Sequence, residues 1–172
     1  MHSVKINALK QEYDELIEFC REQQQVSFEM YINDTYKRSL LLSIASFFET
    51  TISKAIYDFA GQRSQNDPEL VALVNNKAIQ RQYHSLFDWD ANNANKFLKL
   101  FGEPFKQKTR NKIQKKGLTD AEIAFITIGK ERNILVHQNY IEAPVNYTFE
   151  EIFSKYELAC DFVEFLVETL LS

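Results

Sequence analysis

Three polar side chains with complementary chemistry lie close together where an apolar segment of the sequence breaks down. Arg132, Asn133 and His137 all fall within the stretch GKERNILVHQNY, residues 129–140, and the chain has only two other histidines. An imidazole can accept and donate protons near neutral pH. A guanidinium can hold a phosphate through two hydrogen bonds and stabilise a pentavalent transition state, while an amide can orient it. Such a set could cleave a phosphodiester without a metal ion.

The spacing of these three residues leaves two interpretations open. Arg132 and His137 are five residues apart, so an ideal helix would separate their side chains by about 140°. Asn133 and His137, four residues apart, would share one helix face. The set therefore works best near a helix end, where the backbone can loosen and Arg132 can swing beside His137. In the alternative interpretation, Arg132 is a cation favoured by the helix dipole and His137 is a surface residue that caps carbonyl groups.

The composition indicates the kind of fold that must position these residues. The chain has 172 residues, enough for one domain with a sizeable core, and it has only 4 glycines and 3 prolines. It also has 14 phenylalanines and 8 tyrosines. Few turn residues and many aromatic residues favour long regular segments over a sandwich or a barrel. The sequence therefore predicts an all-α protein, with residues 1–172 forming a single helical domain.

Apolar side chains recur at steps of three and four residues in four long segments of the chain. The segments are residues 4–25, residues 33–60, the stretch LTDAEIAFITIGKERNILVHQ and residues 149–170. Residues 83–118 are less regular, which indicates short helices in the middle of the chain. The pattern predicts an up-and-down bundle of four main helices with extra short helices in the middle.

Residue types typical of helix ends mark the expected bounds of these segments. Those that predict a start are Asn33 or Asp34, Asp67 with Pro68, and Thr119 with Glu122 in a capping box. Gly61 predicts a stop after the second main helix, and the short helix that Pro68 opens is expected to run through about Gln82.

The cysteines and the N-terminal segment indicate the compartment. Cys20 and Cys160 lie far apart without a C-x-x-C pairing, which suits a reducing cytosol and neither a disulfide framework nor a zinc site. No N-terminal segment resembles a signal peptide, and no apolar run approaches the ~18 residues of a membrane span. We therefore expect a cytoplasmic protein without a membrane partner. No Gly-rich phosphate loop, H-E-x-x-H motif or ligand cluster is present, so no metal or other cofactor is expected.

The charge of the chain is unevenly distributed. The net charge is −4, yet residues 96–116 contain eight basic residues and one acidic residue. Such segregation allows a local positive field on an acidic protein. The candidates for contact with RNA phosphates in this segment are Lys106, Lys108, Arg110, Lys112, Lys115 and Lys116. The alternative is that these residues only keep the protein soluble.

The irregular middle of the chain contains further candidates with a simpler explanation. His84 is conceivable as a second catalytic base, but a partly exposed histidine in an aromatic cluster is the preferred interpretation. Trp89, Phe97 and Phe101 could stack on nucleic-acid bases, although aromatic residues at such positions usually belong to the core.

The stretch ERNILVHQNY resembles the R-x4-6-H motif of the HEPN superfamily, in which an arginine, usually followed by a polar residue, precedes a histidine. The segment LLLSIASFFETTISKAI is similar to the second helix of the RiboL-PSP and Abi-like HEPN clades, and NNANKFLKLFG adds to the likeness. The resemblance covers roughly residues 30–170. It implies metal-independent endoribonuclease activity, with Arg132, Asn133 and His137 at the signature positions.

The resemblance also implies a role for Glu49. Related clades often have an acidic or other polar residue on the second helix that faces the motif. Glu49 lies on the most apolar helix, where an unpaired carboxylate would be costly. The alternative is a boundary residue that reaches solvent or pairs with a lysine such as Lys54.

The number of proton-transfer groups suggests an assembly. Cleavage through a 2′-hydroxyl requires a base for the nucleophile and an acid for the leaving oxygen, whereas one motif supplies a single histidine. A homodimer would bring two copies of Arg132 and His137 into one composite site, as the resemblance also implies. We therefore expect an RNA-cutting homodimer that acts as a defence or toxin component, with a cognate antitoxin protein as a further partner. The alternative is a non-catalytic HEPN module that binds RNA or a partner protein.

Overall fold

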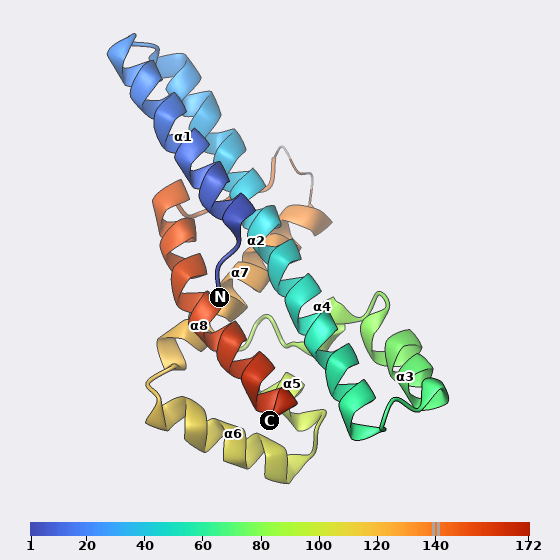
Figure 1. Ribbon diagram of the computed structural model, residues 1–172. Coiled ribbons are helices and arrows are strands. Elements are labelled where there is room, and N and C mark those ends of the chain that lie inside the picture. Colours follow the sequence, from blue (N-terminus) through green and yellow to red (C-terminus); the bar gives the residue numbers. More distant parts are fainter. Residues whose placement is uncertain (139, 141) are drawn as a thin grey trace.

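The computed structural model describes residues 1–138, 140 and 142–172, and Figure 1 shows the arrangement of its helices. The elements are α1 (Val4–Glu22), α2 (Val26–Arg63), α3 (Pro68–Val74), the π-helical turn η1 (Asn75–Ile79), α4 (Tyr83–Leu86), α5 (Asn95–Lys99), α6 (Glu103–Lys115), α7 (Thr119–His137) and α8 (Phe149–Leu171). No strand occurs in the described part of the chain. The all-α prediction is confirmed.

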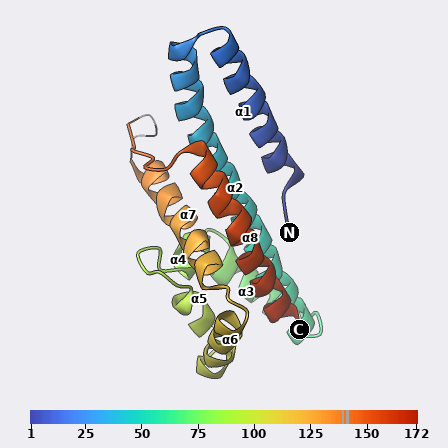
Figure 2. The ribbon, with the colours of Figure 1, turned by 90° about the vertical axis from the view of Figure 1, so that its left-hand side faces the viewer.

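The four longest helices pack against one another around α2, which is 38 residues long. α1 pairs with the N-terminal half of α2 as a hairpin that projects beyond the other helices (Figure 1). α7 and α8 contact each other and also contact α2. The shorter helices α3 to α6 lie around the opposite end of α2 (Figure 2). The motif helix α7 is therefore supported by two long neighbours.

Aromatic side chains fill the space between these helices. Phe48 of α2 stacks near Tyr156 of α8 and also contacts Phe125 of α7. Phe87 stacks on Phe97, and both rings are buried. The prediction that Phe97 belongs to the core and does not stack on bases is thus confirmed. Most of the aromatic content of the sequence serves this core, in which burial of apolar area is the main stabilising contribution.

The sequence predicts no segment that is long and apolar enough to span a membrane, and α2 departs from this expectation. By length and composition alone it could cross a membrane, with a window of mean hydropathy 1.2. The helix packs against α1, α7 and α8, and many of its apolar side chains lie in the core. Burial between helices accounts for this composition, which is consistent with a soluble protein.

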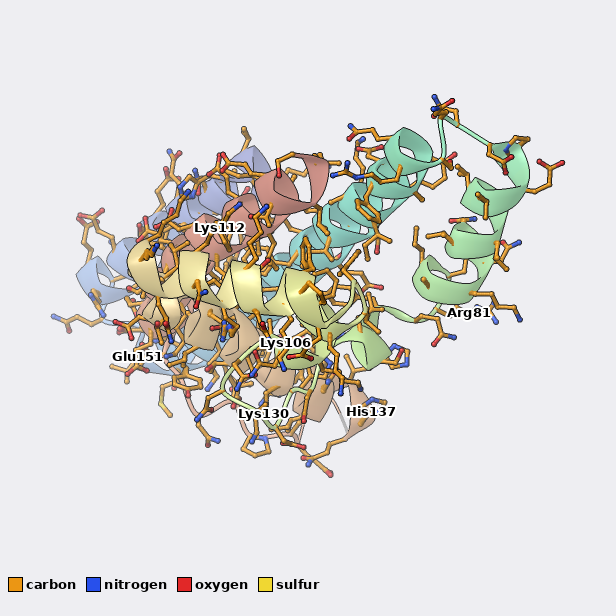
Figure 3. All side chains as sticks on the ribbon, turned by 90° about the horizontal axis from the view of Figure 1, so that it is seen from below. Arg81, Lys106, Lys112, Lys130, His137 and Glu151 are labelled. Atoms are coloured by element: carbon orange, nitrogen blue, oxygen red, sulfur yellow. The ribbon has the colours of Figure 1, made fainter. Side chains whose placement is uncertain are left out.

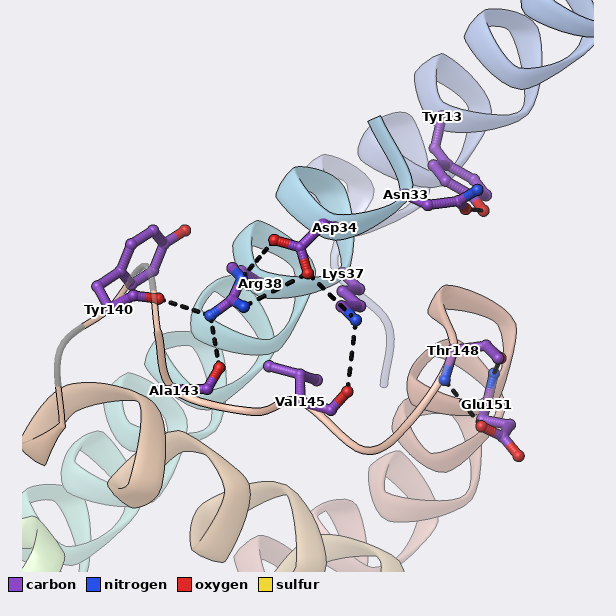
Figure 4. Close-up of polar contacts among 10 residues, drawn as sticks. All are labelled: Tyr13, Asn33, Asp34, Lys37, Arg38, Tyr140, Ala143, Val145, Thr148 and Glu151. Atoms are coloured by element: carbon purple, nitrogen blue, oxygen red, sulfur yellow. Dashed lines mark hydrogen bonds and ion pairs between the residues drawn. The ribbon is translucent and has the colours of Figure 1, made fainter. Parts of the chain in front are cut away.

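The second helix begins earlier and ends later than its residue types predicted. α2 starts at Val26, so Asn33 and Asp34 lie inside it, and Gly61 is a buried residue within its last turn. The polar residues are used for tertiary contacts instead of caps. Asn33 accepts a hydrogen bond from the Tyr13 hydroxyl of α1. Asp34 pairs with Arg38 at 2.9 Å (Figure 4).

Arg38 fixes the segment that follows α7. Its guanidinium is buried and donates to the carbonyl oxygens of Tyr140 at 2.5 Å and Ala143 at 2.8 Å (Figure 4). Hydrogen bonds from a charged donor to buried carbonyl groups are among the stronger polar contacts in proteins. Tyr140 and Ala143 are therefore held against the N-terminal half of α2.

Of the two other predicted caps, that of α3 is confirmed and that of α7 is wrong. Asp67 accepts a hydrogen bond from the Leu70 N–H at 2.8 Å and Pro68 opens α3, which gives way to η1 after Val74. Thr119 is the first residue of α7 and makes no capping box. The capping box of this chain lies at the start of α8, where Thr148 and Glu151 bond reciprocally (Figure 4).

Candidate functional site

α7 remains helical through His137, so Arg132, Asn133 and His137 all lie on regular helix. The expectation that the backbone loosens before His137 is therefore wrong. Arg132 bends toward its neighbour instead, and its Nη1 donates to Asn133 Oδ1 at 3.2 Å. The geometry keeps Arg132 and Asn133 together and leaves His137 one turn further along the helix.

Arg132 and Asn133 line a small cavity of about 10 Å³, room for roughly one water molecule. Ile128 and Gly129 line it from the previous turn of α7. Phe125 of α7 lines it as well, and the walls contributed by other parts of the chain are Ala45 and Phe48 of α2, Tyr83 and His84 of α4, and Trp89. The cavity is too small for a nucleotide, so a ligand could only lie across its mouth.

The helix face that lines the cavity continues toward the end of α7. Residues three and four positions apart share a face, so the next turn presents Val136 and His137 beyond Arg132 and Asn133. His137 is exposed, and Val136 is 50% exposed. His137 lies on the Asn133 side of this face. The polar surface therefore runs from the cavity to the last turn of the helix.

Trp89 holds the segment containing α4 against α7. A Cβ atom on Gly129 would lie 1.9 Å from Trp89 Cζ3, so the ring occupies the space that a side chain would need. The indole Nε1 donates to the His84 carbonyl oxygen at 2.7 Å. This combination requires glycine at position 129 and fixes the backbone of His84 beside the motif.

Glu49 faces the motif from α2. Its Oε2 lies 3.9 Å from Arg132 Nη2, and the two side chains are 42% and 28% exposed, respectively. Lys54, the alternative partner, pairs with Asp58 instead at 2.6 Å. The long distance and partial exposure describe a weak ion pair. Glu49 thus orients Arg132 and leaves donors of its guanidinium available for another partner.

Tyr83 is the buried titratable group of this cluster. Burial raises the pKa of its phenol, the carboxylate of Glu49 raises it further, and the charge of Arg132 acts in the opposite direction. The phenol therefore stays protonated at neutral pH. Tyr83 serves as an apolar wall of the cavity beside Phe87 and Trp89.

The basic segment lies at the other end of α7. In sequence it directly precedes the motif helix, but Thr119 and His137 are the two ends of a 19-residue helix, about 27 Å apart. Figure 3 shows Lys106 and Lys112 along α6 and His137 at the end of α7. A ligand that contacts both regions would have to span this length.

The six basic candidates differ in their surroundings. Arg110 binds the buried carboxylate of Glu122 at 2.5 Å, and Lys106 pairs with Glu103 at 3.0 Å. Lys108 is exposed. An open groove between α6 and the end of α8 is lined by Lys112, Lys115, Lys116, Phe165, Glu168, Thr169 and Ser172. The three lysines of this groove are the members of the set best placed to contact a phosphate.

Among the described residues, no group of three or more His, Cys, Asp or Glu side chains is placed to hold a metal ion. The side chains around the motif offer a guanidinium, an amide, a carboxylate and an imidazole. Such groups can bind a phosphate and move protons.

His84 has the surroundings that the sequence predicts. Its neighbours Tyr83 and Trp89 form an aromatic cluster and its side chain is exposed, and the residue also lines the cavity with Arg132 and Asn133. No spacing rule connects these residues, because they lie on different helices. The packing of Trp89 on Gly129 and on Phe125 helps to bring them together.

The chain matches the model of a known protein family. The family model described as RiboL-PSP-HEPN matches residues 7–172. The matched region includes every residue that lines the cavity, as well as α6 and the groove beside it. No curated protein and no solved structure matches the chain.

Proposed function

The chain belongs to the RiboL-PSP-HEPN family, and from that premise we propose that it is a metal-independent endoribonuclease. The observation that best supports the proposal is the weak ion pairing of Arg132. Its guanidinium lies at the mouth of a cavity, bonds to Asn133 and meets Glu49 only at 3.9 Å. A phosphate can replace so weak a partner, because bidentate contacts between guanidinium and phosphate are stronger.

In the proposed reaction, the phosphate of an RNA strand lies against Arg132 and Asn133. His137 accepts the proton of the 2′-hydroxyl, and the 2′-oxygen forms a bond to phosphorus as the bond to the 5′-oxygen breaks. The 5′-oxygen receives a proton from an acid. The products are a 2′,3′-cyclic phosphate and a 5′-hydroxyl, so neither water nor a metal ion enters this step. Arg132 stabilises the charge of the pentavalent transition state.

Glu49 has an orienting role in this proposal. Its carboxylate holds Arg132 toward the cavity before RNA binds, and the remaining exposure of both side chains lets the guanidinium turn toward a phosphate. Because like charges repel, Glu49 also disfavours a phosphate placed directly over α2. Both effects direct the RNA backbone toward the α7 side of the cavity.

We further propose that two copies of the chain form a composite site. One motif supplies a single histidine, whereas a two-fold axis beside α7 would place two copies of Arg132 and His137 in one cleft. The exposed Val136 and Tyr140 near the end of the motif helix support this arrangement, because apolar and aromatic side chains are typical of interface centres. The proposed setting is a defence or toxin system in the cytoplasm, with a cognate antitoxin protein as partner.

The experiment is RNA cleavage in the presence of EDTA. Wild-type protein and the variants His137→Ala, Arg132→Ala and His2→Asn are incubated with mixed RNA at equal folded concentration. We expect cutting by wild type and His2→Asn, with about 10²–10⁴-fold slower cutting by His137→Ala. No cutting by wild type, or equal cutting by His137→Ala, contradicts the proposal. RNA binding without cutting that persists when Arg132 and His137 are both replaced indicates a non-catalytic binding module instead.

A further inference from the structure

The cavity beside the motif contains a second imidazole, that of His84. Among the described residues that line the cavity, three side chains can titrate, namely Tyr83, His84 and Arg132. Arg132 is too basic to exchange protons at neutral pH. Burial and the carboxylate of Glu49 raise the pKa of Tyr83, which therefore keeps its proton. His84 is the one that can transfer a proton under physiological conditions.

The backbone of His84 is fixed although its side chain is exposed. Its neighbours Tyr83 and Leu86 are buried in the core, and its carbonyl oxygen accepts the Trp89 Nε1 hydrogen bond at 2.7 Å. Trp89 in turn fills the space above Gly129 on α7. These contacts hold the backbone of His84 at the cavity that Arg132 and Asn133 also line, and they leave its side chain exposed. A catalytic acid requires this kind of fixed placement beside its substrate.

We propose that His84 is the general acid of the reaction, donating a proton to the 5′-oxygen as that oxygen leaves phosphorus. This inference rests on the endoribonuclease function proposed above. His137 takes one proton from the 2′-hydroxyl and His84 gives one to the 5′-oxygen, so the step is balanced in protons. Exchange with water then returns both imidazoles to their starting forms.

Charged groups on the elements that pack around the cavity include Arg132, which lines the cavity with His84, and Glu49 of α2, which lies 3.9 Å from Arg132. The loop after α4 contributes Asp90, which pairs with Lys130 at 3.2 Å. A phosphate that takes Arg132 from Glu49 therefore lies at the cavity that His84 also lines.

This assignment changes what a second copy of the chain must supply. With His84 as acid and His137 as base, one protomer holds both proton-transfer groups. A second protomer would then enclose the RNA and contribute another Arg132 to the phosphate. The competing source of the acid is the second copy's His137, and the experiment separates the two sources.

The experiment compares two leaving groups on one RNA oligonucleotide. Wild type first maps a cleavage position, and the 5′-oxygen there is then replaced by sulfur. A thiolate leaves without protonation, because thiols are far more acidic than alcohols. His84→Asn should cut ordinary RNA about 10²–10⁴-fold more slowly and should recover most of this loss on the sulfur substrate. His137→Ala should remain slow on both, since its loss affects the nucleophile. His2→Asn is the matched histidine control and should cut like wild type.

Far-UV circular dichroism establishes that His84→Asn is folded. The pH dependence of the cleavage rate then provides a second test. The wild-type rate on ordinary RNA should fall at high pH as the acid loses its proton, and His84→Asn should lack that fall. If wild type cuts and His84→Asn cuts equally well, the inference is overturned while the proposed function stands. Slow cutting of both substrates by folded His84→Asn also overturns the inference. If wild type cuts nothing, the proposed function fails and this inference fails with it.

Discussion

Two arginine–glutamate pairs lie at opposite ends of α7 and differ in almost every respect. At the N-terminal end, Arg110 reaches both carboxylate oxygens of Glu122 at 2.5 Å, and the Ala94 N–H donates to the same carboxylate at 2.6 Å. Glu122 is 1% exposed. At the C-terminal end, Arg132 and Glu49 are 3.9 Å apart and both are partly exposed.

The difference indicates two roles for the same pair of residue types. Glu122 joins α7 to α6 and to the residue before α5, and burial raises the pKa of its carboxyl although Ala94 and Arg110 act to lower it. A carboxylate with this environment has no capacity left for a ligand. Arg132 does have such capacity, because a weak partner leaves most of its donors available. We infer that the first pair stabilises the fold, whereas the second belongs to the proposed phosphate site.

Removing the buried carboxylate should have the largest effect on stability. Glu122→Ala leaves Arg110 and the Ala94 N–H without their partner, so we expect a loss of about 3–5 kcal/mol in the free energy of unfolding. Glu49→Ala is the matched variant at the other end and should cost no more than about 1 kcal/mol. Urea unfolding of both variants measures the difference. Equal losses would show that the two pairs do not differ in the way proposed.

Adding a methyl group to Gly129 should have the next largest effect. The new Cβ would overlap the Trp89 ring, and overpacking of this kind costs about 1–3 kcal/mol. Because Trp89 is the only tryptophan, a change in its fluorescence emission should report the displacement. Gly61→Ala is the control, since its Cβ would meet only the side-chain oxygen of Asn66 at 2.9 Å. Gly129→Ala with unchanged stability and emission would refute the close packing of Trp89 on α7.

The salt dependence of RNA binding tests whether the N-terminal end of α7 is purely structural. If the groove lysines contact phosphates, replacing Lys112, Lys115 and Lys116 by Gln should flatten the plot of log affinity against log salt. Each lost contact to single-stranded RNA should change its slope by about 0.7. Lys54 does not line the groove and is already paired with Asp58, so Lys54→Gln should leave the slope unchanged. An unaltered slope in the triple variant would assign these lysines to solubility alone.

Glu131 should produce a small pH effect next to the motif. It is buried on α7, its Oε2 has no hydrogen-bond partner among the described residues, and burial raises its pKa. The folded state therefore binds this proton more tightly than the unfolded state. The free energy of unfolding should fall as pH rises from the ordinary glutamate pKa through the raised one, by at most ~1.4 kcal/mol per pH unit. Glu131→Gln should remove this contribution. The same dependence of the free energy of unfolding on pH in wild type and in Glu131→Gln would contradict it.

The sequence predicted helices well because apolar periodicity is a local property. The four periodic segments coincide with most of α1, α2, α7 and α8, and the Asp67 cap of α3 is confirmed. Helix ends were predicted less well where polar residues serve tertiary contacts. Asn33 and Glu122 have side chains typical of helix starts, yet they bind Tyr13 and Arg110. A single sequence does not distinguish a capping carboxylate from a buried one.

The site was predictable only in part. The spacing in the motif indicated Arg132, Asn133 and His137, and the resemblance indicated that Glu49 faces them. The place of His84 was not predictable, because it depends on the contact between Trp89 and Gly129. Nor does the order of residues reveal that the lysine groove lies at the far end of α7 from His137.

The most direct test of the central proposal, that the C-terminal end of α7 cleaves RNA through the 2′-hydroxyl, is the chemistry of the ends it leaves. RNA cut by wild type in EDTA is analysed by mass spectrometry. A 2′,3′-cyclic phosphate on one fragment and a 5′-hydroxyl on the other are expected, and a 2′-deoxy substitution at the cleavage position should abolish cutting there. Fragments with a 5′-phosphate and a 3′-hydroxyl, or cutting that persists at the 2′-deoxy position, would contradict the proposal, because water would then have attacked the phosphate.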